Sequence, residues 1–210
     1  MDGKNCFINK GLKVSNSISD KLFFNEYSLR LQDVLAKSDW SPVVKLAEDL
    51  QLCLKENRRL FICGNGGSAG NAIHLANDFL YGIAKRSGGG LKVLSLSDNP
   101  AVITCLANDL GYDQIFSEQL AVQGEKNDLL IVLSGSGNSP NIIRVINQAK
   151  KMNIKSYAIL GFDGGQCKEL ADVAIHFSVN DMQIAEDMQI VVGHMIMQWL
   201  YMNRPKIDLK

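Results

Sequence analysis

Cys63-Gly-Asn-Gly-Gly-Ser-Ala-Gly70 follows a short apolar run at residues 60–63 and leads into a stretch with helical periodicity. A second segment, Ser134-Gly-Ser-Gly-Asn-Ser-Pro-Asn141, stands in the same way between the apolar run 129–133 and another helical stretch. A strand followed by a glycine-rich turn and a helix is typical of parallel α/β sheets. The two segments therefore predict an α/β fold with both turns at the carboxyl ends of strands in one sheet.

The rest of the chain repeats this alternation. Most of the apolar runs lack a polar face, which is typical of strands buried on both sides. We therefore expect a doubly wound parallel sheet, preceded by two helices between residues 21 and 56 and followed by a last helix at 182–202. The predicted strands are 60–63, 91–96, 129–133, 156–160 and 173–177, and the predicted helices between them are 68–84, 112–123, 141–152 and 166–171.

The length of 210 residues fits one domain, which we place at residues 21–203 with the two N-terminal helices included. Residues 1–20 are polar and are predicted to form an extension, and residues 204–210 a short tail. The 22 basic and 22 acidic side chains give a net charge of zero, so no basic field favours nucleic acid or an anionic membrane. The longest apolar stretch, 190–202, is too short and too interrupted to span a bilayer.

The five cysteines are odd in number and contain no C-x-x-C pair. This pattern disfavours a disulfide framework or a structural zinc knuckle. It favours reduced thiols, so we expect a cytoplasmic protein.

The second turn carries three hydroxyl groups, at Ser134, Ser136 and Ser139, and contains neither lysine nor arginine. Ligands of open α/β sheets bind at the carboxyl ends of the strands, where helix N-termini offer free N–H groups to anions. Turn formation and helix capping alone would explain one such turn. Two turns at one edge favour a site where neutral donors hold a phosphate monoester.

Four motifs together resemble the sugar isomerase (SIS) domain: Gly64-Asn-Gly-Gly-Ser68, Ala72-x-His74-x-Ala76, Ala107-Asn-Asp109-x-Gly111 and the serine turn. Within that superfamily the chain is most similar to the phosphoheptose isomerases, over about residues 25–202. These enzymes convert sedoheptulose 7-phosphate to D-glycero-D-manno-heptose 7-phosphate. The resemblance implies a single SIS domain with a five-stranded parallel sheet. It also implies a homotetramer in which the N-terminal helices pack between subunits.

The resemblance also assigns residues to the substrate. They fall into three groups, one around the sugar, one around the phosphate and one at the sugar hydroxyls. These groups are Asn65, Gly66, Gly67 and Ser68; Ser134, Gly135, Ser136 and Ser139; and Asn108 and Asp109.

Another set of residues has acid–base and metal-binding chemistry. His74 and Asp78 are four residues apart on one predicted helix face, and Glu186 and His194 lie on the last helix. The matching residues of phosphoheptose isomerases are His, Glu, Gln and His, which gather a zinc ion and the acid–base pair. The resemblance therefore implies a zinc site formed by His74, Asp78, Glu186 and His194, with Glu186 also at the substrate. Isomerisation through an enediol needs a base and an acid, for which Asp78 and His194 are our candidates.

The spacing on the last helix limits this interpretation. Glu186 and His194 are eight residues apart, which is roughly 12 Å along a helix axis. Either one of them is not a ligand, or helices from neighbouring subunits combine. We therefore expect the active site at a subunit interface. The chain also departs from the family pattern, with Asp78 in place of Glu and Gln189 where many members have a second histidine.

The sequence thus predicts a phosphoheptose isomerase that supplies heptose for lipopolysaccharide, capsule or surface glycans. Two alternatives stay open. One is a non-catalytic SIS-domain regulator that binds a protein partner, such as the relatives that bind the replication initiator. The other is an isomerase or sensor for another sugar phosphate. Retention of His74, an acid at position 78 and His194 favours the enzyme.

Overall fold

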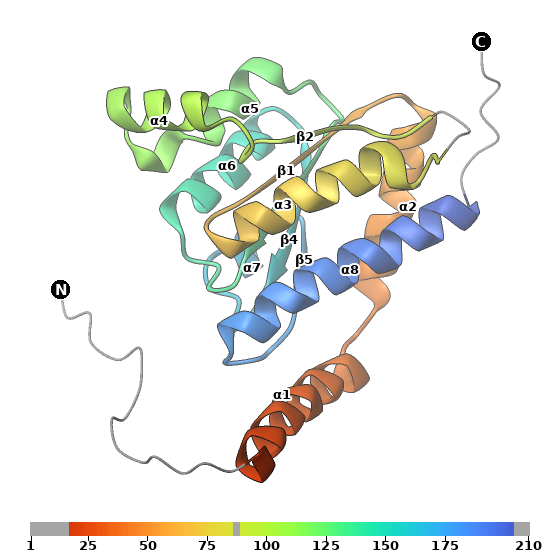
Figure 1. The fold of residues 1–210 in the computed structure, drawn as a ribbon. Helices are drawn as coiled ribbons and strands as arrows, with labels where there is room; N and C mark the ends of the chain where they lie inside the picture. Colours follow the sequence, from red (N-terminus) through yellow and green to blue (C-terminus); the bar gives the residue numbers. More distant parts are fainter. Residues whose placement is uncertain (1–16, 86–88, 204–210) are drawn as a thin grey trace. The chain divides into compact units, whose positions relative to one another are not determined.

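The computed structural model describes residues 17–85 and 89–203. Its centre is a five-stranded sheet with the strand order β2-β1-β3-β4-β5, and every neighbouring pair of strands is parallel (Figure 1). The predicted α/β fold and all five predicted strands are therefore confirmed. The strands are β1 (Arg59–Gly64), β2 (Lys92–Ser95), β3 (Leu129–Ser134), β4 (Lys155–Leu160) and β5 (Val173–His176).

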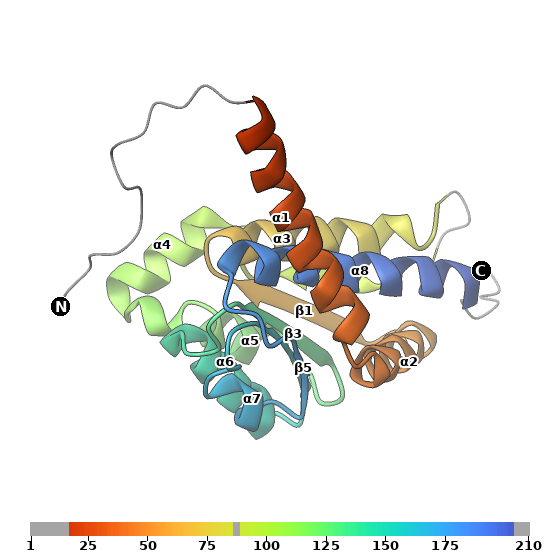
Figure 2. The ribbon, with the colours of Figure 1, turned by 90° about the horizontal axis from the view of Figure 1, so that it is seen from below.

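Helices cover both faces of the sheet, as Figure 2 shows from below. One face carries α3 (Gly67–Asn77) and α8 (Met182–Asn203), with α2 (Ser41–Lys55) packed against α8. The opposite face carries α5 (Ser117–Gln123), α6 (Pro140–Lys151) and the single turn α7 (Cys167–Leu170). Burial on both faces explains the continuous apolar runs, because β3 is buried at all six positions.

One helix, α4 (Pro100–Asp109), is absent from the sequence prediction. Its signal was Asn99-Pro100. The Asn99 side chain caps the helix by accepting from the N–H groups of Ala101 at 3.1 Å and Val102 at 3.2 Å. No residue of α4 is fully buried, and its apolar face against the core consists of the partly buried residues Ile103, Leu106 and Ala107.

Two predicted helices are each divided into two elements. The stretch 68–84 contains α3 and a π-helical turn, η1 (Asp78–Gly82), in which the Ile83 N–H donates to the Asp78 carbonyl at 3.2 Å. The stretch 112–123 contains the 3₁₀ turn η2 (Tyr112–Gln114) and α5. The π-helical turn begins at Asp78, and such turns frequently occur at functional sites.

The chain divides into two units, residues 1–37 and 38–210. In the first unit, α1 (Ser17–Lys37) begins within the segment that was predicted to be an extension. The remainder of that extension, residues 1–16, and the predicted tail, 204–210, lie outside the described residues. None of the described helices has the length and apolarity needed to cross a membrane.

Candidate active site

The two glycine turns meet at the carboxyl ends of β1 and β3, which are neighbouring strands. Asn65 in the first turn and Asn141 in α6 exchange amide hydrogen bonds of 2.9 and 2.8 Å, and the Tyr112 hydroxyl donates to Asn65 Oδ1 at 3.0 Å. Between the turns lies a cleft of about 250 Å³. Its lining residues are Asn65, Gly66, Gly67, Ser68, Leu133, Ser134, Gly135, Ser136, Ser139, Met182 and Glu186.

Glycine is required in the first turn for two reasons. Gly66 has a φ of 55°, in the left-handed region that glycine adopts without strain. A Cβ at Gly67 would lie 2.5 Å from both carboxylate oxygens of Glu186. Glu186, in the second turn of α8, therefore lies directly over the N-terminus of α3.

The serine turn offers neutral donors to the same cleft. The Ser134 hydroxyl oxygen accepts from the Gly137 N–H at 3.0 Å, which leaves its own proton for another acceptor. Ser139 is the N-cap of α6, but its side chain makes no capping hydrogen bond. Burial raises the pKa of the Cys63 thiol beside the first turn, so that thiol stays neutral. The cleft thus combines hydroxyl groups with helix N-termini, which is chemistry suited to a phosphate group.

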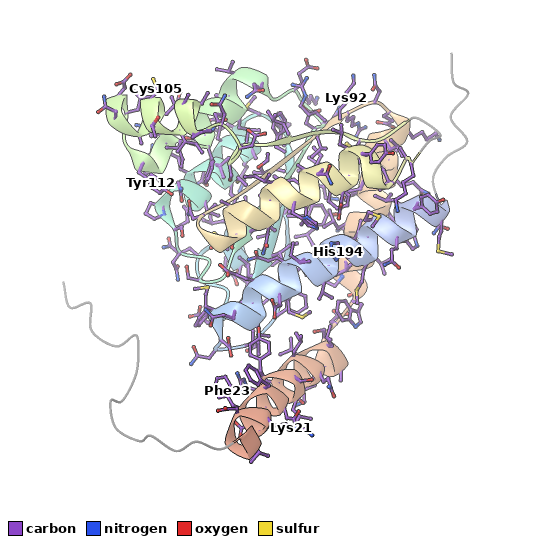
Figure 3. The ribbon with its side chains drawn as sticks, in the orientation of Figure 1. Lys21, Phe23, Lys92, Cys105, Tyr112 and His194 are labelled. Carbon is purple, nitrogen blue, oxygen red and sulfur yellow. The ribbon has the colours of Figure 1, made fainter. Side chains whose placement is uncertain are left out.

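A second group of functional side chains lies further along α3 and α8. His74 Nε2 and His194 Nε2 are 2.9 Å apart, and Asp78 Oδ2 lies 3.4 Å from the first and 3.3 Å from the second. Figure 3 shows His194 in the middle of α8, close to α3. We call His74, Asp78 and His194 the His/Asp cluster. Its histidines are about half exposed and its aspartate side chain is 15% exposed.

Close helix packing brings the cluster together. A Cβ at Gly193 would lie within about 3 Å of three side-chain carbons of Leu75 on α3. The absence of a side chain at Gly193 therefore lets α8 approach α3 at the residue before His194. His74 and Asp78 reach the same point because they are four residues, about one helical turn, apart and so lie on one face of the helix.

The His/Asp cluster has the geometry of a metal site. Two imidazole nitrogens and one carboxylate oxygen form a donor set that zinc accepts. Ligand atoms at roughly 2.0–2.1 Å from a tetrahedral zinc are separated by roughly 3.3 Å. The three observed separations, 2.9, 3.3 and 3.4 Å, are close to that value. The residues present therefore fit a zinc ion.

The structure distributes the predicted site residues among three places. Within one chain, Glu186 lies in the cleft and is not part of the His/Asp cluster. Asn108 and Asp109 end α4, where Asn108 donates to Asp109 at 2.9 Å, and neither lines the cleft. All the other predicted sugar and phosphate residues line it.

Several site residues escaped the sequence prediction. Asn141 and Tyr112 form hydrogen bonds with Asn65, and Leu133 and Met182 also line the cleft. Asn141 is the last residue of the segment that forms the serine turn, which was its only local signal. His176, the third histidine of the chain, belongs to neither group, and its Nε2 lies 3.0 Å from the Phe162 carbonyl oxygen.

Comparison with known proteins identifies the family. The SIS domain family matches residues 23–161. A phosphoheptose isomerase from Helicobacter pylori (strain Shi470) is 39% identical over 143 residues, which cover 68% of this chain and 74% of that protein. Another, from Chlorobaculum parvum, is 35% identical over 178 residues, which cover 82% of this chain and 83% of that protein.

Solved structures show the same relationship. A phosphoheptose isomerase from Neisseria gonorrhoeae has a TM-score of 0.78 at 26% identity, over 88% of this chain and 98% of that one. The structure from Francisella tularensis has a TM-score of 0.83 at 23% identity, over 90% and 100%, which supports the fold. The chain therefore belongs to the SIS domain family and, within it, to the phosphoheptose isomerases.

Proposed function

We propose that the protein isomerises sedoheptulose 7-phosphate to D-glycero-D-manno-heptose 7-phosphate. Relatives named phosphoheptose isomerase are 35–39% identical to the chain. The acid–base residues that a non-catalytic regulator would lack are present as the His/Asp cluster. These two facts favour the isomerase over the regulator and over an isomerase or sensor for another sugar phosphate.

The observation that carries the proposal is the spacing of the cleft and the cluster along the same helices. Gly67 at the cleft and His74 in the cluster are seven residues apart on α3, which is roughly 10 Å of helix. A heptose 7-phosphate has its phosphate at one end and its reacting carbons, C1 and C2, at the other. An elongated ligand of this kind suits a phosphate cleft and an acid–base cluster about 10 Å apart.

The two oxygens of Asp78 suit two tasks. Oδ2 faces both imidazoles, whereas Oδ1 makes no hydrogen bond to any part of the chain that the structure describes. We assign Oδ1 to take the proton from the substrate carbon and return it to the neighbouring carbon. His194 exchanges the proton at the sugar oxygens, and this general acid–base pair is worth about 10²–10⁴-fold in rate.

We assign zinc to the His/Asp cluster, one ion per site. When bound, zinc would stabilise the negative charge that develops on the sugar oxygens. Glu186 is the fourth residue of the predicted set, and because it lies in the cleft of its own chain, only a Glu186 from a neighbouring chain could join the metal. Asn108 and Asp109 would likewise contact sugar hydroxyls across such an interface.

A turnover assay tests this function. The protein is stripped of metal with a chelator, then supplied with sedoheptulose 7-phosphate with and without zinc, and the aldose product is followed by NMR. We expect product only in the sample with zinc. A folded protein that forms no product under either condition would refute the isomerase.

We further propose a homotetramer with active sites at subunit interfaces. The support is an apolar groove between α2 and α8, lined by Trp40, Val43, Val44, Ala47, Met195, Ile196 and Trp199. Val44 is 54% exposed and Met195 43% exposed in the single chain, and burial of such surface favours association. Light scattering should give four times the chain mass. The substitution Val44→Glu should lower that mass, and a wild-type monomer would exclude the proposal.

The cysteines indicate the cellular setting. We propose a cytoplasmic enzyme because Cys53, Cys63, Cys105 and Cys167 are all free thiols. Its product would supply heptose for lipopolysaccharide, capsule or other surface glycans. Deletion of the gene should then remove heptose from these glycans, which sugar analysis of the cell surface would measure.

A further inference from the structure

Three side chains connect the first glycine turn to α8. Gln189, which is 1% exposed, lies between Asn71 and Ser68, both of which belong to α3. Its Oε1 accepts from Asn71 Nδ2 at 2.9 Å, and its Nε2 donates to Ser68 Oγ at 3.0 Å. Asn71 Nδ2 also donates to the backbone carbonyl of Glu186 at 3.0 Å.

The backbone carbonyl of Glu186 fixes which group donates and which accepts in each of these three hydrogen bonds. A carbonyl oxygen only accepts, so the amide nitrogen of Asn71 must face it. The same nitrogen faces Gln189, which must therefore present its oxygen to Asn71 and its NH₂ group to Ser68. An amide NH₂ only donates, so the Ser68 hydroxyl oxygen is held as an acceptor.

The remaining proton of Ser68 is thus available to a ligand. Ser68 Oγ makes no second hydrogen bond to the described residues, and Ser68 lines the cleft in the first turn of α3. The N-terminal N–H groups of that helix favour an anion at the same place. A phosphate oxygen, which accepts and carries negative charge, satisfies both requirements.

We propose that Gln189 is a positioning residue that holds Ser68 as a hydrogen-bond donor to an oxygen of the bound phosphate group. The inference rests on the proposed function, because a phosphate ester is the ligand. It explains how Gln189 serves the site at a position where a histidine is common in the family. Gln189 acts through Ser68 and does not touch the ligand itself.

The substitution Gln189→Glu tests the proposal. A carboxylate still accepts from Asn71, but it cannot donate, so it takes the Ser68 proton and removes it from the cleft. We expect the dissociation constant of inorganic phosphate, measured by calorimetry, to rise about tenfold, as loss of one charge-assisted hydrogen bond requires. With sedoheptulose 7-phosphate, KM should rise more than kcat falls.

The control is the same substitution in a Ser68→Ala background, which separates the hydroxyl from the added charge. If Gln189 acts through Ser68, the second substitution should then change phosphate binding by less than about twofold. An equally large effect without the Ser68 hydroxyl, or no effect with it, would overturn the proposal. Should Gln189→Glu not fold, Gln189→Met serves in the same cycle, with an expected weakening of about threefold.

The calorimetry also separates this inference from the isomerase activity. Phosphate binding that responds to Gln189 only when Ser68 is present supports the inference, even if the wild-type protein shows no turnover. If the protein turns over substrate but neither KM nor phosphate binding responds to the substitution of Gln189, the inference is overturned and the proposed isomerase activity stands. A wild-type protein that binds no phosphate overturns the inference.

Discussion

The cleft and the His/Asp cluster share α3 and α8 but are built in different ways. Most residues that line the cleft come from the two glycine turns, whose hydroxyl and amide donors are neutral, and α8 adds Met182 and Glu186. The cluster joins His74 to a histidine 120 positions away, and it depends on the close approach of two helices at Gly193. The proposed binding site and the proposed proton-transfer site are therefore separate within one chain, and changes in one should leave the other largely intact.

The largest expected effect is that of Asp78→Asn in the cluster. Loss of the proposed base should lower kcat by about 10²–10⁴-fold. Because Asp78 is ten residues beyond Ser68, which is roughly 15 Å along the helix, the affinity for inorganic phosphate should change by less than about twofold. Steady-state kinetics and calorimetry measure the two values.

The matched control for this charge change is Glu169→Gln. Glu169 is exposed on α7, on the opposite face of the sheet. It should leave both kcat and phosphate affinity unchanged. Retained turnover in the Asp78→Asn protein would move the base to another residue.

Ser134→Ala should produce the opposite result in the cleft. It removes a hydroxyl proton from the phosphate site, so the dissociation constant for inorganic phosphate should rise about tenfold. It should leave kcat and the zinc content, measured by elemental analysis, within about twofold of wild type.

Ser156→Ala is the control for Ser134→Ala. The Ser156 hydroxyl donates to Asp172 at 2.8 Å near the start of β4, at the other end of the strands. This variant should lose stability without loss of phosphate affinity. Equal loss of affinity in both variants would show that general destabilisation, and not the cleft hydroxyl, is responsible.

The next effect concerns the packing that supports the cluster. Gly193→Ala places a methyl group against Leu75, and such overpacking costs about 1–3 kcal/mol in the free energy of unfolding. Zinc affinity should fall with it, because α8 must move away from α3. Denaturant unfolding and metal titration provide the measurements.

Gly70→Ala is a sharp comparison for Gly193→Ala. Gly70 lies in α3, and a Cβ at this position would point into open space, so alanine should stabilise the helix by about 0.5–1 kcal/mol. If both alanine variants lowered stability and zinc affinity alike, helix contact at Gly193 would not be the cause.

The same difference between cleft and cluster decided what the sequence could predict. Both turns are local, so their glycines and serines placed the cleft at the correct edge of the sheet. The helix α4 was missed because its cap, Asn99, was the only strong local signal. The π-helical turn at Asp78 has no sequence pattern that separates it from the α-helix before it.

Contacts between segments that are distant in the chain could not be predicted from the sequence. The residues of α8 could be assigned to a helix, but the side of α8 that faces α3 depends on tertiary packing at Gly193. The resemblance to the family grouped Glu186 with the histidines, and within one chain the structure places its carboxylate over Gly67. The bonds from Asn71 through Gln189 to Ser68 depend on the same packing.

The smallest expected effect is that of Glu186→Gln, and it tests where the boundary between the two structures lies. The carboxylate of Glu186 lies in the cleft and opposes a phosphate anion, so its neutralisation should strengthen phosphate binding by about threefold at low salt. The gain should shrink as ionic strength rises. Stability should fall by about 0.3–1 kcal/mol, because the negative charge no longer faces the N-terminus of α3.

The spacing of Glu186 and His194 on α8 left two arrangements open: either one of them is not a metal ligand, or helices from neighbouring chains combine. The zinc content of the Glu186→Gln protein distinguishes between them. The three donors of the His/Asp cluster remain, so we expect one zinc per chain to be retained. Zinc lost on Glu186→Gln as fully as on Asp78→Asn would mean that a carboxylate from a neighbouring chain completes the metal site. In that case the cleft of one chain and the His/Asp cluster of another would form a single active site. The cleft and the cluster would then be separate only when a single chain is considered.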